Sequence, residues 1–246
     1  MKRFVFLFGA CATLCFLAVL ACQTEVRATD DNEKPEIVGP VPAFKVQTLE
    51  KRLAKDVSFK AQYPQFGIAL IDNDIERHVK AALNEFLSTG TDADDKYEYT
   101  LGYSIYATTP GIISVVLSMA VIEPVWSGWS LDAMTYDLSS QKLLRLADIF
   151  PDWEKSRSKL LALARVPYKA DVCDSSYIKF DDKRKKFDNF YITPKKLVMS
   201  FNGGPTPIHV GAGESECAFF SITKANLKKA GADMRYWETT PIPAPK

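Results

Sequence analysis

The sequence has little of what metal-dependent and nucleophilic hydrolases need. Its 246 residues include only two histidines, His78 and His209, and no second histidine lies at the spacing of a metal-binding pair. A catalytic zinc site requires several converging ligands, so a site of that kind is not indicated. No GxSxG motif supplies a serine at a strained turn. We expect His78 to be a boundary residue of a helix and His209 a hydrogen-bonded strand residue.

An excess of charge of one sign is also missing. The chain has 31 Lys and Arg against 30 Asp and Glu, a formal net charge of +1. A nucleic-acid partner is therefore not expected, because such partners need a clustered basic surface. The basic run at 183–186 follows Asp181 and Asp182 and is typical of a solvated turn. The glycines at 211–213 lack the following helix and lysine of a phosphate loop, so we expect no cofactor.

The first residues predict export. Lys2 and Arg3 precede an apolar run over 4–21, the layout of a secretory signal. Cleavage after Ala28 would release a soluble protein, whereas Val19-Leu20-Ala21-Cys22 is similar to a bacterial lipobox and would place a lipid on Cys22. A retained membrane anchor is the third alternative. All three place the body in the periplasm or another extracytoplasmic space, with membrane contact only through the anchor.

Two of the five cysteines, Cys173 and Cys217, lie beyond the signal region. Paired cysteines in an oxidising compartment favour a disulfide. The enclosed loop is long, so the bond would stabilise the fold by about 4 kcal/mol if it is unstrained. A catalytic cysteine is the rival interpretation, but no motif positions a histidine for either residue.

Periodicity predicts the elements in the first half of the chain. Residues 29–44 contain three prolines and are expected to be a linker, and 45–70 to hold a strand pair. A helix is predicted from about Asn73, because Asn73 and Glu76 have the spacing of a capping box. A polar loop follows at 88–95. The apolar stripe of this helix comprises Ile71, Ile75, Val79, Leu83 and Phe86.

A sheet is predicted next. Apolar and polar residues alternate over 97–105, which indicates a half-buried strand, and 112–122 is apolar enough for a central strand covered on both faces. We expect a loop at 124–130, a returning strand at 133–138 and a turn at 139–141. Three leucines, Leu143, Leu144 and Leu146, are expected to point inward.

The second half alternates short strands with helices. A helix is predicted over 153–165, with Asp148 and Asp152 as capping candidates. A strand is expected at 217–222, and Thr223 would cap a short helix that ends near Lys229. Strands interspersed with a few helices predict an α+β fold, mainly an antiparallel sheet packed with helices. Four further short strands are predicted at 177–180, 187–192, 197–201 and 208–210.

Short motifs in a fixed order resemble a known family. They are YPQF, SVVL, TYDL, LADIF, FYIT, LVMSF and FFSITKANL. This order is similar to the family called domain of unknown function 3298 (DUF3298), preceded by a smaller 4163-type segment that is associated with peptidoglycan deacetylases. The resemblance covers roughly residues 45–230. It divides the chain into a signal (1–28, or ending before Cys22), a linker (29–44), a 4163-type subdomain (45–95), a DUF3298-type domain (96–230) and a tail (231–246).

The resemblance implies a binding or sensing role. Relatives include the outer region of lysozyme-sensing anti-sigma factors and an accessory region of a peptidoglycan deacetylase, where output or catalysis lies elsewhere. Many members carry a histidine where this chain has Gly128-Trp129-Ser130, so a role that rests on that histidine is not expected here.

Paired carboxylates could still cleave or modify a glycan. Asp72 with Asp74, and Asp132 with Asp137, are the candidate pairs. Residues at helix starts and turns have the same pattern, and this interpretation is favoured. We therefore expect no enzyme activity, while a glycan-modifying envelope enzyme with an unrecognised site is the alternative.

Aromatic residues are the binding candidates: Trp126, Trp129, Tyr103 and Tyr106. Exposed Trp and Tyr rings offer large contact areas with a polar tip, and their faces suit sugar rings. Burial in the core is the competing interpretation. The expected partner is a cell-envelope protein, such as a lysozyme-like hydrolase, or a peptidoglycan-type glycan.

The cysteine pattern generates a direct prediction. Thiol labelling of the denatured, unreduced mature protein should find neither Cys173 nor Cys217 free, because the two are joined. Two labelled thiols would overturn the disulfide assignment.

Overall fold

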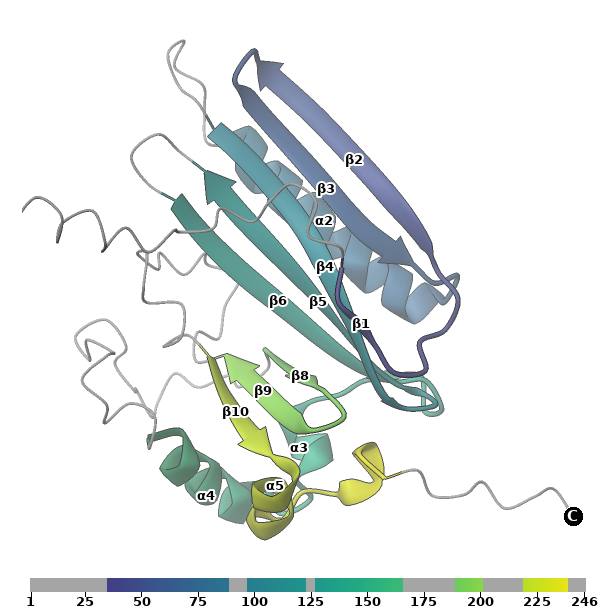
Figure 1. Cartoon of the computed structure of the whole chain (residues 1–246), viewed down its shortest axis with the longest axis vertical. Coiled ribbons are helices and arrows are strands. Elements are labelled where there is room, and N and C mark those ends of the chain that lie inside the picture. The colour runs from purple at the N-terminus through teal and green to yellow at the C-terminus, as the bar shows by residue number, and fades with distance from the viewer. Residues whose placement is uncertain (1–34, 89–96, 123–126, 166–188, 201–218, 239–246) are drawn as a thin grey trace, which may run out of the picture. The chain divides into compact units, whose positions relative to one another are not determined.

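A computed structural model describes residues 35–88, 97–122, 127–165, 189–200 and 219–238 (Figure 1). Two sheets organise them. The larger has the order β2-β3-β4-β5-β6-β7, with β1 beside β4, and the smaller has the order β10-β9-β8. All pairs are antiparallel except β1–β4 and β3–β4. The α+β prediction is confirmed.

The strands are β1 (Ile37–Val38), β2 (Lys45–Ala54), β3 (Val57–Gln65), β4 (Tyr97–Thr109), β5 (Ile112–Ile122), β6 (Ser127–Asp137), β7 (Lys142–Leu143), β8 (Phe190–Ile192), β9 (Lys196–Ser200) and β10 (Phe219–Thr223). The helices are α2 (Ala69–Ser88), α3 (Leu146–Ile149), α4 (Trp153–Arg165), α5 (Lys224–Ala230) and the 3-10 turn η3 (Met234–Tyr236).

Helix α2 covers one face of the larger sheet (Figure 1). Its predicted stripe is correct: Ile71, Ile75, Val79 and Phe86 are at most 2% exposed. The predicted start is wrong, because α2 begins at Ala69 and the proposed capping residue lies inside it. Gly67, at φ 72°, ends the preceding strand region. The Asp72 carboxylate then accepts a hydrogen bond from the backbone N–H of Phe66 at 2.7 Å.

Strands β4 and β5 match their predictions closely. Odd-numbered residues of β4 from 99 to 105 are buried in the core that α2 covers, and β5 has the predicted limits. Residues 112–117 of β5 are buried on both faces, but Ser118 and Ile122 are exposed. Among the described elements, the main contacts of the second sheet with β4, β5 and β6 are those of β8. β5 is therefore fully covered only in its first half.

Several local predictions need correction. β6 begins at Ser127, six residues earlier than expected, because its ladder with β5 continues to the pair Ile122–Ser127. Trp129 therefore lies in a strand and not in a loop. Leu144 and Leu146 are buried as predicted, whereas Leu143 is 39% exposed. Thr223 precedes α5, but its side chain makes no capping hydrogen bond.

Some of the remaining predictions for the second half of the chain are confirmed, and others fall on residues outside the described ranges. Helix α4 has the predicted limits, and Asp152 accepts a weak hydrogen bond from the Lys155 N–H at 3.4 Å. Asp148 instead lies within α3, where it accepts from the Arg145 N–H at 2.8 Å. Strands β8, β9 and β10 correspond to three predicted strands. The strands expected at 177–180 and 208–210 lie outside the described residues.

Segments expected to be a linker and a tail are partly packed into the fold. Gly39, at φ 88°, approaches β4 so closely that a Cβ atom would lie 1.9 Å from the Ala107 carbonyl oxygen. At the other end, Trp237 is 5% exposed and its indole donates to the Thr193 carbonyl at 3.1 Å. β3 also pairs with β4 across the 95/96 boundary, so the expected subdomains share one sheet. The described residues all belong to one compact unit that begins at Pro35.

A buried chain of hydroxyl groups joins the two sheets. Ser114 of β5 and Thr135 of β6 are 0% and 1% exposed, and their hydroxyl oxygens lie 2.8 Å apart. The Ile192 N–H donates to Ser114 at 3.0 Å, and Thr135 donates to the Phe190 carbonyl at 3.2 Å. We call these two side chains the hydroxyl seam. They provide hydrogen-bond partners for the backbone groups on the edge of β8 that does not pair with β9.

Asn189 extends the same connection. Its amide oxygen accepts from the Ala133 N–H at 2.8 Å, and its amide nitrogen donates to the Leu131 carbonyl at 2.6 Å. One side chain thus replaces a missing strand partner on β6. Together with the hydroxyl seam, it fixes the position of β8 on the sheet.

The seam predicts coupled effects of mutation. Thr135→Val and Ser114→Ala should each lower the free energy of unfolding by about 1–3 kcal/mol, because each leaves buried backbone groups without a partner. Urea titrations of both single mutants and the double mutant measure the coupling. Strictly additive losses would contradict a seam that acts as one unit.

Candidate functional site

Two tyrosines from different sheets form a partly exposed aromatic site. The rings of Tyr106 (β4) and Tyr191 (β8) stack with centroids 5.1 Å apart and an interplanar angle of 20°. The Tyr106 hydroxyl donates to the Glu36 carboxylate at 2.7 Å. Both rings are half-buried and Glu36 is exposed. We call Tyr106, Tyr191 and Glu36 the tyrosine platform.

Local structure explains how these residues meet. β1 pairs with β4 in the register Val38–Tyr106, and the Ile105 N–H donates to the Glu36 carbonyl at 2.8 Å. This pairing holds Glu36 beside the side chain of Tyr106. Tyr191 lies between Phe190 and Ile192, the two residues whose backbones contact the hydroxyl seam. Because side chains alternate along a strand, Tyr191 lies on the side opposite its buried neighbours.

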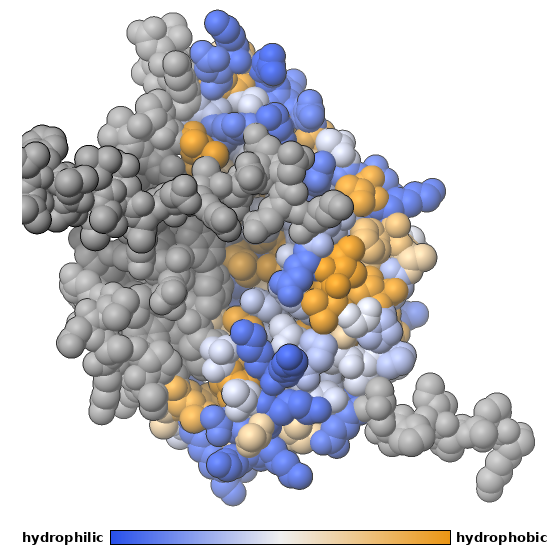
Figure 2. Space-filling view, viewed as in Figure 1, coloured by the Kyte–Doolittle hydropathy of each residue, from blue (hydrophilic) through white to orange (hydrophobic). Residues whose placement is uncertain are grey.

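Both phenols are neutral at neutral pH, as tyrosines ordinarily are, and burial raises their pKa further. Burial raises the pKa of Tyr106, and the hydrogen bond to Glu36 raises this pKa further. Burial and the nearby Glu36 charge likewise raise the pKa of Tyr191. The platform therefore offers neutral hydroxyl groups beside one carboxylate. Apolar surface lies nearby, since Ile37 is 48% exposed and Figure 2 shows an apolar patch near the passage from β1 to β2.

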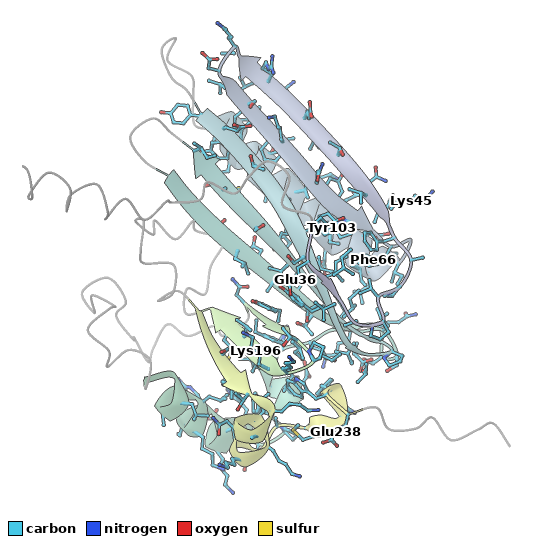
Figure 3. The ribbon with its side chains drawn as sticks, in the orientation of Figure 1. Glu36, Lys45, Phe66, Tyr103, Lys196 and Glu238 are labelled. Carbon is cyan, nitrogen blue, oxygen red and sulfur yellow. The ribbon has the colours of Figure 1, made fainter. Side chains whose placement is uncertain are left out.

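Of the four aromatic residues expected at a binding surface, the described members Tyr103, Tyr106 and Trp129 lie at separate places in the fold. Tyr103 is 5% exposed and faces the core, where Phe44 lies 6.2 Å away in a T-shaped contact and Phe66 lies nearby (Figure 3). Its prediction as a surface residue is wrong, because odd positions of β4 face α2. Trp126 lies outside the described residues.

Trp129 is remote from Tyr106 along the sheet. Tyr106 pairs with Ser114, and Trp129 pairs with Ala120, six residues further along β5. At about 3.3 Å per residue, this separates the two positions by roughly 20 Å. Of the described members of the expected set, only Tyr106 belongs to the platform. Tyr191 was missed, although its position between two apolar residues is a signal of outward orientation.

A second polar group lies between α2 and β6. Tyr136 is fully buried and donates to Asp74 at 3.2 Å, and Arg77 also binds Asp74. One turn along α2, the His78 Nδ1 lies 3.1 Å from the Asp132 carboxylate. Residues 74 and 78 share one helix face, and residues 132 and 136 share one strand face. The Tyr136–Asp74 and His78–Asp132 contacts therefore lie side by side and join α2 to β6.

The hydrogen bonds of these polar side chains attach α2 to β6. Burial and the Asp74 charge raise the pKa of Tyr136, so the phenol remains a donor. Burial raises the pKa of Glu85, and the Asp132 charge raises it further. Asp72 and Asp137 serve a helix start and a turn, since Asp137 accepts from the Ser139 N–H at 2.9 Å. The roles of Asp72 and Asp137 agree with the expected helix-start and turn positions, whereas Asp74 and Asp132 instead join α2 to β6.

Metal ligands, grooves and membrane-spanning helices are the other features of the described part of the chain that bear on a site. No group of three or more potential metal ligands occurs among the described residues. A groove of about 440 Å³ runs along α2, lined by Asn73, Glu76, Arg77, Lys80, Ala81 and Asn84. It contains neither Asp74 nor Asp132. None of the described helices is long and apolar enough to cross a membrane.

Several expected residues cannot be placed. Cys22, Cys173, Cys217 and His209 lie outside the described residues, as does the basic run at 183–186. The lipid anchor and the disulfide therefore stay predictions.

The fold is similar to solved structures. A DUF3298 family protein from Pseudomonas aeruginosa PAO1 matches with a TM-score of 0.57 and 13% identity, over 82% of this chain and 99% of that chain. This chain has the DUF3298 fold. A DUF3298 member from Bacteroides fragilis NCTC 9343 matches with a TM-score of 0.47 and 11% identity, over 80% and 98% of the two chains. No family model and no curated protein matches the sequence.

The α2–β6 ties generate a stability prediction. Tyr136→Phe should lower the free energy of unfolding by about 1–3 kcal/mol, because it leaves the Asp74 carboxylate with one partner fewer in a buried position. His78→Gln should cost less than about 1 kcal/mol, since its contact is partly exposed. Chemical denaturation measures both variants. A larger loss for His78→Gln than for Tyr136→Phe would contradict this assignment.

Proposed function

We propose that this chain is a non-catalytic, extracytoplasmic binding or sensing module of the DUF3298 family. The observation that carries the proposal is the tyrosine platform. Two half-buried rings, a carboxylate and exposed apolar surface converge there from three separate segments. Aromatic surface with polar edges is typical of recognition sites.

The chemistry of the platform favours a peptidoglycan-type glycan or an envelope protein that presents similar groups. Sugar rings can pack their C–H faces on aromatic rings. Their hydroxyl and amide groups can form hydrogen bonds with the phenols and with the Glu36 carboxylate. An envelope protein, such as a lysozyme-like hydrolase, could use the same residues through its own aromatic or amide side chains. The export signal expected at the N-terminus supports access to both partners.

A glycan-modifying enzyme is the second candidate. Glu85 favours it, because burial and Asp132 raise the pKa of this carboxyl toward that of a general acid. Product analysis after incubation with peptidoglycan fragments separates the candidates. Release of modified fragments that disappears in Glu85→Gln would replace binding with catalysis as the function.

Mutation of the platform tests binding. Tyr106→Ala and Tyr191→Ala should each weaken binding of the mature protein to its partner by about 2 kcal/mol, as removal of an interface anchor does. Tyr106→Phe is the matched control, because it keeps the ring and removes only the bond to Glu36. Val46→Ala, at a side chain that is 52% exposed on β2, controls for general surface changes.

Binding isotherms against peptidoglycan fragments and purified envelope proteins should be run beside thermal melts. A platform role requires that affinity falls while the melting temperature changes little. Losses of affinity that follow unfolding would assign the two rings to packing alone. Unchanged affinity in both alanine variants would remove the platform from the proposal.

A further inference from the structure

The net charge is near neutral, but the first half of the chain beyond residue 34 is acidic and the second half is basic. Residues 35–141 carry 8 Lys and Arg against 14 Asp and Glu, a net charge of −6. Residues 142–246 carry 19 Lys and Arg against 12 Asp and Glu, a net charge of +7. The second half therefore has the charge excess that the whole sequence lacks, and a surface for an anionic ligand is best sought there.

Exposed lysines gather around α5. Ser156 of α4 donates to the Ala230 carbonyl at 2.8 Å, and the Lys159 amine donates to the Lys229 carbonyl at 3.0 Å. These contacts bring the lysines of α4 to the end of α5. At the start of α5, the Lys224 N–H donates to the Lys195 carbonyl at 3.2 Å. We call the following six side chains the α5 basic surface: Lys155, Lys159, Lys195, Lys196, Lys228 and Lys229.

All six side chains are exposed. Within the described ranges, none of their amines forms a salt bridge, and the nearby Asp233 instead pairs with Arg235 at 3.0 Å. The surface is mostly hydrophilic where α4 and α5 lie (Figure 2), and Lys196 lies at the start of β9 (Figure 3). Charge on this surface is therefore not neutralised by its described neighbours.

We propose that the α5 basic surface binds the anionic phospholipid headgroups of a membrane. The N-terminal sequence favours this occupant, because two of its three alternatives, a lipid on Cys22 and a retained apolar run at 4–21, attach the chain to a bilayer. Only twelve residues, 23–34, separate Cys22 from the described body. They reach at most roughly 40 Å, so the tether holds the body near the lipid surface. A polybasic surface commonly supplies the second signal that a lipid anchor needs.

This inference goes beyond the proposed function, since it concerns different residues and a different ligand. Failure of the platform mutants to affect partner binding would leave it intact. Conversely, loss of lipid binding would leave recognition at Tyr106 and Tyr191 in place.

Vesicle sedimentation of the full chain tests the proposal. Binding to vesicles that contain 30% phosphatidylglycerol should exceed binding to pure phosphatidylcholine vesicles, and 0.5 M NaCl should remove the difference. The pure phosphatidylcholine vesicles measure the contribution of the apolar N-terminus, which does not depend on lipid charge. The double variant Lys228→Ala/Lys229→Ala should weaken the charge-dependent part about 30-fold.

The matched control is Lys45→Ala/Lys51→Ala, which removes the same charge from exposed positions on β2. It should change binding less than about threefold, because β2 belongs to the acidic half. Equal losses in both double variants would show that only net charge matters and would overturn the proposal. Equal binding to both vesicle types would also overturn it. So would self-association that Lys228→Ala/Lys229→Ala abolishes without an effect on vesicles, because the occupant would then be the acidic half of a second copy.

Discussion

The structure depends on how the unpaired edge of β8 is satisfied. A strand that packs on the face of another sheet presents backbone groups that cannot reach water, and an unsatisfied buried group costs about 1–3 kcal/mol. Ser114 and Thr135 answer this need with two hydroxyl groups that relay hydrogen bonds from the Ile192 N–H to the Phe190 carbonyl. Together with Asn189, these two short polar side chains of the larger sheet fix the position of β8.

The position of β8 has consequences for function. Tyr191 stands between the two residues that contact the hydroxyl seam, so the seam places its ring on Tyr106. The platform therefore consists of residues that are far apart in sequence and come from both sheets. The basic residues around α5 lie on α4, on α5 and at the start of β9, and none of them belongs to the platform. Partner recognition and lipid contact can accordingly occur on separate surfaces.

The periodicity of apolar residues correctly predicted those helices and strands in which buried positions recur at a regular spacing. The stripe of α2, the alternation in β4 and the apolar run of β5 each reflect one continuous contact with a neighbouring element. Prediction failed where long-range pairing decides the outcome. Trp129 lies in β6 because β5 is long enough to pair with it. Trp237 is buried because Thr193, 44 residues earlier, accepts its indole hydrogen bond. The platform could not be predicted, because no local pattern connects Glu36 and Tyr106 to Tyr191.

The ring contact between Tyr106 and Tyr191 tests the account most directly. NMR of the protein with labelled tyrosines measures nuclear Overhauser effects between the two rings, in the free protein and in the presence of peptidoglycan fragments or a purified envelope partner. The account predicts a direct effect between the rings in the free protein and chemical-shift changes at both rings on binding. Absence of the ring contact, or a bound partner that shifts neither tyrosine, would contradict it.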